Sequence, residues 1–228
     1  MGIDREHVAD RKFLTDSLSF WNQTTEEERE IIFQNTTTAF YKQGEQVHSA
    51  EQECVGVLLI KKGELRTYIL SEEGKEITLF RQTEGDVCIL TASCVLSSIH
   101  FDVHVDAEKD SEVLVINAPA FSMLCKRNVY VENFSLRVAT ERFSDVMWAM
   151  EQILFMSFDR RLAIFLLDET AKTGTDTVTL THEQIAKYMG SAREVVSRML
   201  KYFAKEGMVE LARGCIKITD RKKLKGLL

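Results

Sequence analysis

Residues 181–203 read THEQIAKYMGSAREVVSRMLKYF and contain two short helical patterns separated by a glycine. Thr181 is followed three residues later by a glutamine, and Ser191 is followed three residues later by Glu194. Each half therefore has the spacing of a capping box, the motif that begins many helices. Gly190 lies where the first helix must end and the chain must reverse, a position that often requires positive φ. The stretch predicts a helix-turn-helix.

The second helix of this stretch has two different faces. Apolar residues recur at spacings of four and three, which turns them toward the core. They are Ala192, Val196, Met199 and Phe203. The other face is polar and carries Arg193, Glu194, Ser197, Arg198 and Lys201.

The polar face has the chemistry of a DNA-reading surface. Arginine can bridge two acceptors of guanine, glutamate can accept from cytosine, and serine can contact a base edge or a phosphate in the major groove. Thr181 and Ser191, at the two expected helix starts, are further candidate DNA contacts. A charged stripe is also typical of a solvated helix face, and Glu194 could simply cap Ser191.

Two short apolar runs follow the second helix, at residues 209–211 and 215–218. The residues between them, Ala-Arg-Gly, predict a hairpin with a basic tip. A helix-turn-helix followed by a small hairpin is a winged helix. Arg213 at the tip is placed to reach a DNA phosphate.

The run AREVVSRMLKYFAKEGMV, residues 192–209, resembles the recognition helix of the Crp/Fnr family of bacterial transcription regulators. That helix carries R-E-x-x-x-R or E-x-x-S-R, and the two patterns overlap here. The run FDRRLAIFLL, residues 158–167, resembles the first helix of the family's C-terminal domain, and the N-terminal part resembles its β-roll. The resemblance implies a non-enzymatic homodimer that binds pseudo-palindromic promoter DNA, with RNA polymerase as a further partner.

Composition is compatible with an ordinary globular protein in a reducing compartment. The chain has 228 residues, of which 45% are hydrophobic, and five cysteines without a C-x-x-C pair. Neither a disulfide framework nor a zinc module is indicated. The sequence shows no apolar run of membrane-spanning length, and its N-terminus, MGIDREHVADRK, is charged. We expect a cytoplasmic protein that does not contact a membrane.

The net charge of −6 is unevenly distributed along the chain. From Met156 onward there are 14 Lys and Arg against 9 Asp and Glu, or +5, which leaves 15 against 26, or −11, for residues 1–155. An acidic body with a basic C-terminal module fits a protein whose phosphate contacts come from one end.

Between about residues 37 and 117 short apolar runs follow one another, with glycines between them. The predicted strands are residues 55–60, 65–70, 77–80, 87–90, 101–105 and 113–116. They predict an antiparallel barrel or sandwich, which the resemblance narrows to a jelly-roll-like β-roll of the cyclic-nucleotide-binding kind. Pro119 is expected as the first residue of a short helix after the last strand.

The predicted fold class is α+β, with three parts. These are a β-roll sensor at residues 1–128, a dimerisation helix at residues 129–156 and a winged-helix DNA-binding domain at residues 157–228. In the central helix, apolar residues alternate at spacings of three and four, which is a heptad seam. The seam residues are Leu136, Ala139, Phe143, Val146, Met150 and Ile153. Such a stripe is often internal core, but a helix of this length between two domains favours a parallel dimer.

The expected signal-binding segment of the β-roll reads EGDVCILTASCVLSSIHFD, residues 84–102. Family members that bind cyclic AMP hold its phosphate with Gly-Glu-Leu and a later Arg-Ser or Arg-Thr. Here Gly85-Asp86 replaces Gly-Glu, and no Lys or Arg occurs between Arg81 and Lys109. A buried phosphodiester would lack a cationic partner, which disfavours cyclic AMP.

The same segment offers Cys88, Cys94 and His100 as candidate effector residues. An iron–sulfur cluster is disfavoured, because the family's cluster uses closely spaced N-terminal cysteines and none precedes Cys54 here. Haem ligation by a thiol or imidazole of the β-roll stays open, as does a redox role for Cys94, although a thiol in an apolar strand is often a small core residue. We predict no metal site, because His100 and His104 are four apart without a third ligand at suitable spacing.

One alternative function belongs to a different class. The chain could be a ligand- or metal-binding β-roll protein, even an enzyme, whose C-terminal module mediates protein contacts. DNA binding should weaken steeply with salt, whereas a protein contact or an enzymatic activity need not.

Overall fold

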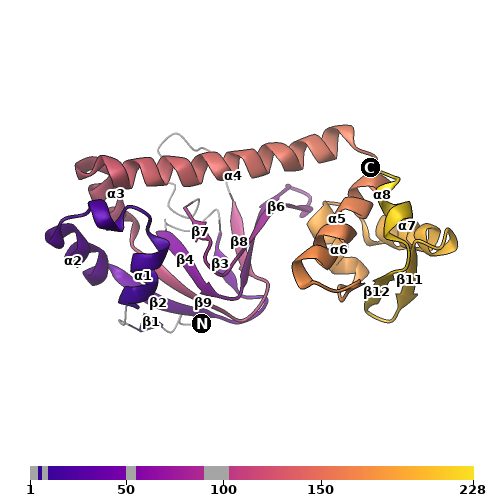
Figure 1. Ribbon diagram of the computed structural model, residues 1–228, viewed down its shortest axis with the longest axis horizontal. Helices are drawn as coiled ribbons and strands as arrows, with labels where there is room; N and C mark the ends of the chain where they lie inside the picture. The colour runs from indigo at the N-terminus through magenta and orange to yellow at the C-terminus, as the bar shows by residue number, and fades with distance from the viewer. Residues whose placement is uncertain (1–4, 7–9, 50–54, 90–102) are drawn as a thin grey trace. The chain divides into compact units, whose positions relative to one another are not determined.

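The computed structural model describes residues 5–6, 10–49, 55–89 and 103–228. The chain divides into two compact units (Figure 1). One unit holds residues 1–70 and 79–146, and the other holds residues 71–78 and 147–228.

Two antiparallel sheets are formed by the strands before residue 117. The five-stranded sheet has the order β1 (Arg5–Glu6), β2 (Thr36–Tyr41), β9 (Ser111–Ile116), β4 (Val57–Lys62) and β7 (Val87–Cys88). The four-stranded sheet has the order β3 (Gln46–His48), β8 (His104–Ala107), β5 (Glu64–Leu70) and β6 (Glu76–Thr83). No helix lies between β2 and β9 in the described parts of this segment, as expected for a β-roll.

Strand β4 is buried on both faces, which explains its uninterrupted apolar run. Val57 and Leu59 belong to a core shared with helices, whereas Leu58 and Ile60 belong to a core shared with the four-stranded sheet. A strand that is apolar at successive positions is typical of a sheet covered on both sides. The five-stranded sheet is therefore the middle layer of the first unit.

Helices cover the outer side of this middle layer. They are α1 (Arg11–Ser17), α2 (Glu26–Gln34), α3 (Ala118–Arg127) and the first turns of α4 (Val129–Phe155), with a short 3-10 turn at Trp21–Gln23. Leu14, Ile32, Phe121 and Phe134 bring these helices into one core with β4 and β9. Helix α3 begins one residue earlier than predicted, with Asn117 as its N-cap, so Pro119 is its second residue.

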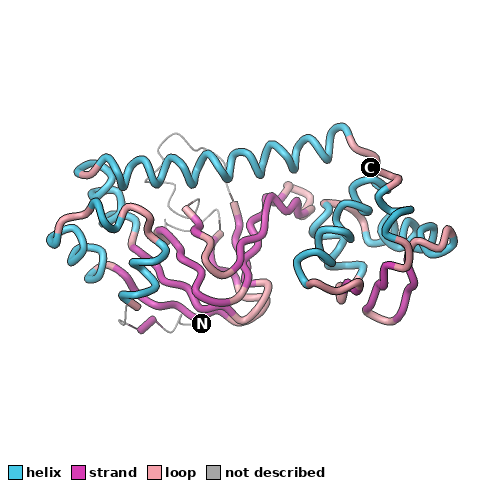
Figure 2. Tube along the Cα trace, in the orientation of Figure 1, coloured by secondary structure: helices cyan, strands magenta, loops and turns pink. Residues whose placement is uncertain are grey.

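The second unit is mainly helical with a small sheet (Figure 2). Its elements are α5 (Phe158–Thr173), β10 (Thr177–Val178), α6 (His182–Met189), α7 (Arg193–Lys205), β11 (Val209–Ala212), β12 (Cys215–Ile218) and α8 (Arg221–Lys225). Strand β12 lies between β10 and β11, so the predicted hairpin is part of a three-stranded sheet. Leu166, Ile185, Leu200 and Ile216 join the helices and this sheet in one core.

The predicted fold class is confirmed in its three main features, the β-roll, the long helix and the winged helix-turn-helix. Strand β2 and the short elements α1, α8, β1 and β3 were not predicted. The short elements are too brief to show a period, and β2 begins with three threonines rather than an apolar run. Among the described residues, no helix has both the length and the apolar character that a bilayer crossing requires.

Candidate nucleic-acid interface

Helix α6 begins with a capping box and ends at a glycine, as its sequence predicts. Thr181 is its N-cap, and a capping box with Gln184 is present. At the other end, Gly190 has φ 58° and ψ 44°, the left-handed conformation in which a residue without Cβ avoids steric cost. These two residues fix where the first helix of the motif starts and stops.

The second predicted capping box is wrong. Helix α7 begins at Arg193, its N-cap is Ala192, and no side chain caps it. The Ser191 amide donates to the Ala186 carbonyl at 2.9 Å, which closes the end of α6. Because Ser191 belongs to the turn, its hydroxyl is not at the start of α7, and Ala192 is exposed rather than part of the core.

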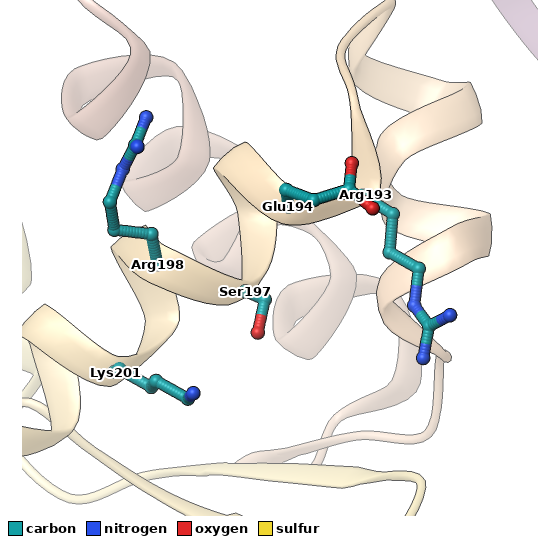
Figure 3. A pocket seen from close by; sticks show the side chains of 5 residues that line it. All are labelled: Arg193, Glu194, Ser197, Arg198 and Lys201. Carbon is teal, nitrogen blue, oxygen red and sulfur yellow. The ribbon is translucent and has the colours of Figure 1, made fainter.

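The remaining residues of α7 divide between core and surface as predicted. Val196 and Phe203 are fully buried, as is Leu200, and Met199 is half-buried against the same core. The polar side chains on the opposite side line a hollow of about 410 Å³ (Figure 3). They are Arg193, Glu194, Ser197, Arg198 and Lys201. In Figure 3 the Arg193 and Arg198 side chains extend in different directions from the helix, and Lys201 lies further along it, so the surface presents cations along its length.

The hairpin of β11 and β12 forms the wing, and its tip is the exposed pair Arg213-Gly214. A second hollow of about 400 Å³ lies between the wing and the helix-turn-helix. Thr181, Arg193 and Arg213 all line it, so the structure brings together three of the predicted DNA-binding residues.

The same hollow contains His182, which sequence analysis did not single out. Burial lowers the pKa of this imidazole, and the nearby positive charges of Arg193 and Lys201 lower it further. A histidine at the first position of a helix after a cap has no motif of its own. Its place in a hollow formed with α7 and the wing is seen only in the structure.

The candidate effector residues are only partly within the described chain. Cys88 lies in β7 and is fully buried, with Leu58 opposite it in β4. Cys94 and His100 lie outside the described residues. Among the residues that are described, no three His, Cys, Asp or Glu side chains gather as a metal site would require.

The structure adds a cation beside the predicted sensor segment. Arg142 of α4 donates from Nη1 to Asp145 Oδ2 at 2.8 Å, and its Nη2 lies 3.6 Å from Asp86 Oδ1. The guanidinium also lies over the Phe80 ring, 5.3 Å from its centroid. The segment 85–105 has no cation of its own, but α4 supplies one at its edge.

The predicted seam of α4 is largely uncovered within this chain. Phe143 is 65% exposed, and Leu136, Met150 and Ile153 are also exposed. Ala139 and Val146 are half-buried, and Val146 packs beside Phe80 and Val103 of the β-roll. Large apolar side chains in water at these spacings are unusual for a lone helix.

Comparison with known proteins agrees with this geometry in both parts of the chain. A Crp-like helix-turn-helix domain matches residues 160–227, and a cyclic nucleotide-binding domain matches residues 38–128. The protein named probable transcriptional regulator flp, from Lacticaseibacillus casei, is 30% identical over 159 residues, which are 68% of this chain and 70% of that protein.

Solved structures extend the likeness to the whole fold. A crystal structure from Eubacterium rectale, described as a transcriptional regulator of the crp/fnr family, is 45% identical with a TM-score of 0.88, and the match covers 92% of this chain and 98% of that one. FixK2 from Bradyrhizobium japonicum shares the fold at 19% identity, with a TM-score of 0.68 over 84% of this chain and 96% of that one. The alternative of an enzymatic β-roll protein is thereby set aside. The chain belongs to the Crp/Fnr family of transcription regulators and binds DNA through its helix-turn-helix.

Proposed function

We propose that this regulator binds pseudo-palindromic promoter sites as a homodimer, with α7 of each subunit in the major groove. The observation that carries this proposal is the division of α7 between a fully buried apolar side and an exposed polar side. A helix held rigidly from behind can present its side chains to base edges without losing much conformational freedom on binding.

The polar side chains have separable roles. Arg193 and Arg198 are proposed to read guanine, Glu194 to read cytosine, and Ser197 to contact a base edge or phosphate. Thr181, Ser191, Lys201 and Arg213 are proposed to contact the sugar-phosphate backbone. Ser191 keeps this role although it caps no helix, because it lies in the turn directly before α7.

The dimer is proposed to form along the exposed apolar side of α4. Pairing of two such helices would remove Leu136, Phe143 and Met150 from water, which is favourable in proportion to the area buried. Ala139, Val146 and Ile153 complete the proposed contact. A twofold dimer presents two recognition helices to half-sites about one DNA turn apart, roughly 34 Å.

The controlling signal is proposed to act at the β-roll. The segment offers thiols, hydroxyls and imidazole. These groups fit an uncharged ligand or a redox change at Cys94, and they also fit a regulator that acts without a ligand. Cys88 and His100 are further proposed contacts for a ligand, haem included. RNA polymerase is the proposed partner at the promoter.

Selection from a pool of random duplexes tests the proposal. We expect enriched sequences to contain two inverted half-sites, and the complex to have the mass of two chains and one duplex. Binding to the enriched site should weaken steeply with salt through counterion release. Enrichment of a single unrepeated half-site would overturn the dimer, and no enrichment at all would overturn sequence-specific recognition.

A further inference from the structure

A hollow lies between the wing and the helix-turn-helix, and His182 is among the residues that line it. Three elements meet there: the start of α6 with His182, the start of α7 with Arg193, and the wing tip with Arg213. The hollow has a volume of about 400 Å³, large enough for a phosphate group with its hydration. All three side chains can donate hydrogen bonds to phosphate oxygens.

Cations outnumber anions around the imidazole. Each element packed around His182 contributes titratable or charged groups. They are Glu183 on α6, Arg193 and Lys201 on α7, Arg213 at the wing tip and Cys215 on β12. In the free protein, burial and the positive charges of Arg193 and Lys201 oppose protonation of the imidazole and lower its pKa.

We propose that His182 contacts a DNA phosphate in its protonated form, so that each subunit takes up a proton when this regulator binds DNA. The inference rests on the proposed DNA-binding role of α7 and the wing. It implies that the affinity of the protein for DNA depends on pH. A phosphate entering the hollow brings a negative charge beside the imidazole and reverses the balance that favours its neutral form.

The sign of the effect follows from linkage. Burial and the neighbouring cations lower the pKa of His182 in the free protein, and a bound phosphate raises that pKa. Between the two values DNA binding consumes a proton, so affinity rises as pH falls. The slope is at most about one factor of ten per pH unit for each subunit that takes up one proton. Above the pKa of the complex the imidazole is neutral in both states, and affinity no longer depends on it.

The test uses the full-length protein with two duplexes of equal length, a site selected at neutral pH and a random sequence. Dissociation constants are measured from about pH 5.5 to 8 at several salt concentrations. Because a phosphate contact carries no sequence information, the rise in affinity toward low pH should occur on both duplexes. The slope of log K against log salt should be steeper at low pH by about 0.9 for each added phosphate contact.

Three variants isolate the imidazole. His182→Gln should lose the pH dependence and stay at the weak, high-pH level. His182→Arg should also be independent of pH but stay at or above the tight, low-pH level, because its charge is permanent. His104→Gln, which removes a histidine of the β-roll, should keep the wild-type pH dependence.

The outcomes separate this inference from the proposed function. Specific binding whose pH dependence survives in His182→Gln would overturn the proton uptake at His182, and so would specific binding without any pH dependence in the wild type. Failure of the wild type to bind the selected site at any pH would instead overturn the proposed function. A histidine NMR titration should show the His182 resonance moving to a higher pKa when the random duplex is added, and an unchanged pKa would contradict the proposal.

Discussion

Thr181 and Gln184 hold the first turn of α6 by two reciprocal hydrogen bonds. The Gln184 amide donates to Thr181 Oγ1 at 3.2 Å, and the Thr181 amide donates to Gln184 Oε1 at 2.9 Å. Each bond satisfies an amide that has no partner inside the helix. Ser191 has the same spacing to Glu194 in the sequence, yet α7 has no side-chain cap.

Replacing each hydroxyl tests this difference. Thr181→Ala should lower the free energy of unfolding by about 1 kcal/mol, because it removes an N-cap. Ser191→Ala should lower it by no more than about 0.5 kcal/mol, because that side chain caps nothing. Urea denaturation followed by circular dichroism measures both, with Thr181→Ser as the control that keeps a hydroxyl. Equal losses for the two alanine variants would contradict the assignment of the caps.

The ends of helix α6 could be predicted from the sequence because they depend on neighbouring residues. Contacts between segments that are far apart in the sequence could not be predicted. Gly190 and Thr181 act within four residues of their partners, so their patterns were sufficient. The spacing of Ser191 and Glu194 was misleading, because a serine three residues before a glutamate can either cap the next helix or lie in the turn that ends the previous one. Ser191 lies in the turn that ends α6. His182 and the Arg142–Asp86 pair depend on how separate elements pack, which no local pattern encodes.

The recognition residues should separate specificity from general affinity. Arg193→Ala and Glu194→Ala are each expected to lose about 1–3 kcal/mol at the selected site and much less on random DNA. Arg213→Ala, at the exposed wing tip, should weaken all sequences alike and reduce the salt slope by about one unit. Fluorescence anisotropy with both duplexes measures these changes. Equal losses on both duplexes for Arg193→Ala would show that it contacts only the backbone.

The exposed side of α4 offers a matched pair of variants for the dimer. Met150 and Trp148 are 46% and 49% exposed, so a charge at either should leave the subunit folded. They are two residues apart on a helix, about 200° around its axis, so only Met150 belongs to the seam. Met150→Glu should give monomers in sedimentation, because two like charges would meet in an apolar contact. Trp148→Glu should remain a dimer, and a dimeric Met150→Glu would show that the seam is not the contact.

His48 should make the stability of the β-roll depend on pH. Burial lowers the pKa of this imidazole in the folded protein, and the charge of His104 lowers it further. Above the unfolded value of about 6.5 both states are neutral, and the full stability is present. As pH falls from that value to the lowered pKa of the folded state, only the unfolded chain takes up the proton, so stability is lost.

The loss should reach at most about 1.4 kcal/mol per pH unit. Urea denaturation between about pH 5 and 7.5 measures it in the wild type and in His48→Gln. The difference between the two removes the contribution of the carboxylates. A wild-type slope retained in full by His48→Gln would place the titrating group elsewhere.

Arg142 bears directly on whether this regulator senses cyclic AMP, because it is a cation beside the expected phosphate position. Its guanidinium is already engaged by the carboxylates of Asp86 and Asp145, and its side chain is only 14% exposed. A phosphodiester entering there would have to displace at least one carboxylate, which would then remain partly buried without its partner. The two carboxylates already outweigh the single positive charge of Arg142, so this cluster has no net positive charge that would attract a phosphate.

Cyclic AMP at millimolar concentration should consequently leave the melting temperature of the wild type unchanged. A ligand present at about a hundred times its dissociation constant would stabilise the fold by about 2.7 kcal/mol, a shift that thermal denaturation detects easily. Asp145→Asn removes one of the two competing charges and is the variant in which weak nucleotide binding would first become visible. A saturable shift in the wild type that disappears in Arg142→Ala would contradict the prediction and would make Arg142 the phosphate ligand, since the segment from Gly85 to Val105 contains no lysine or arginine.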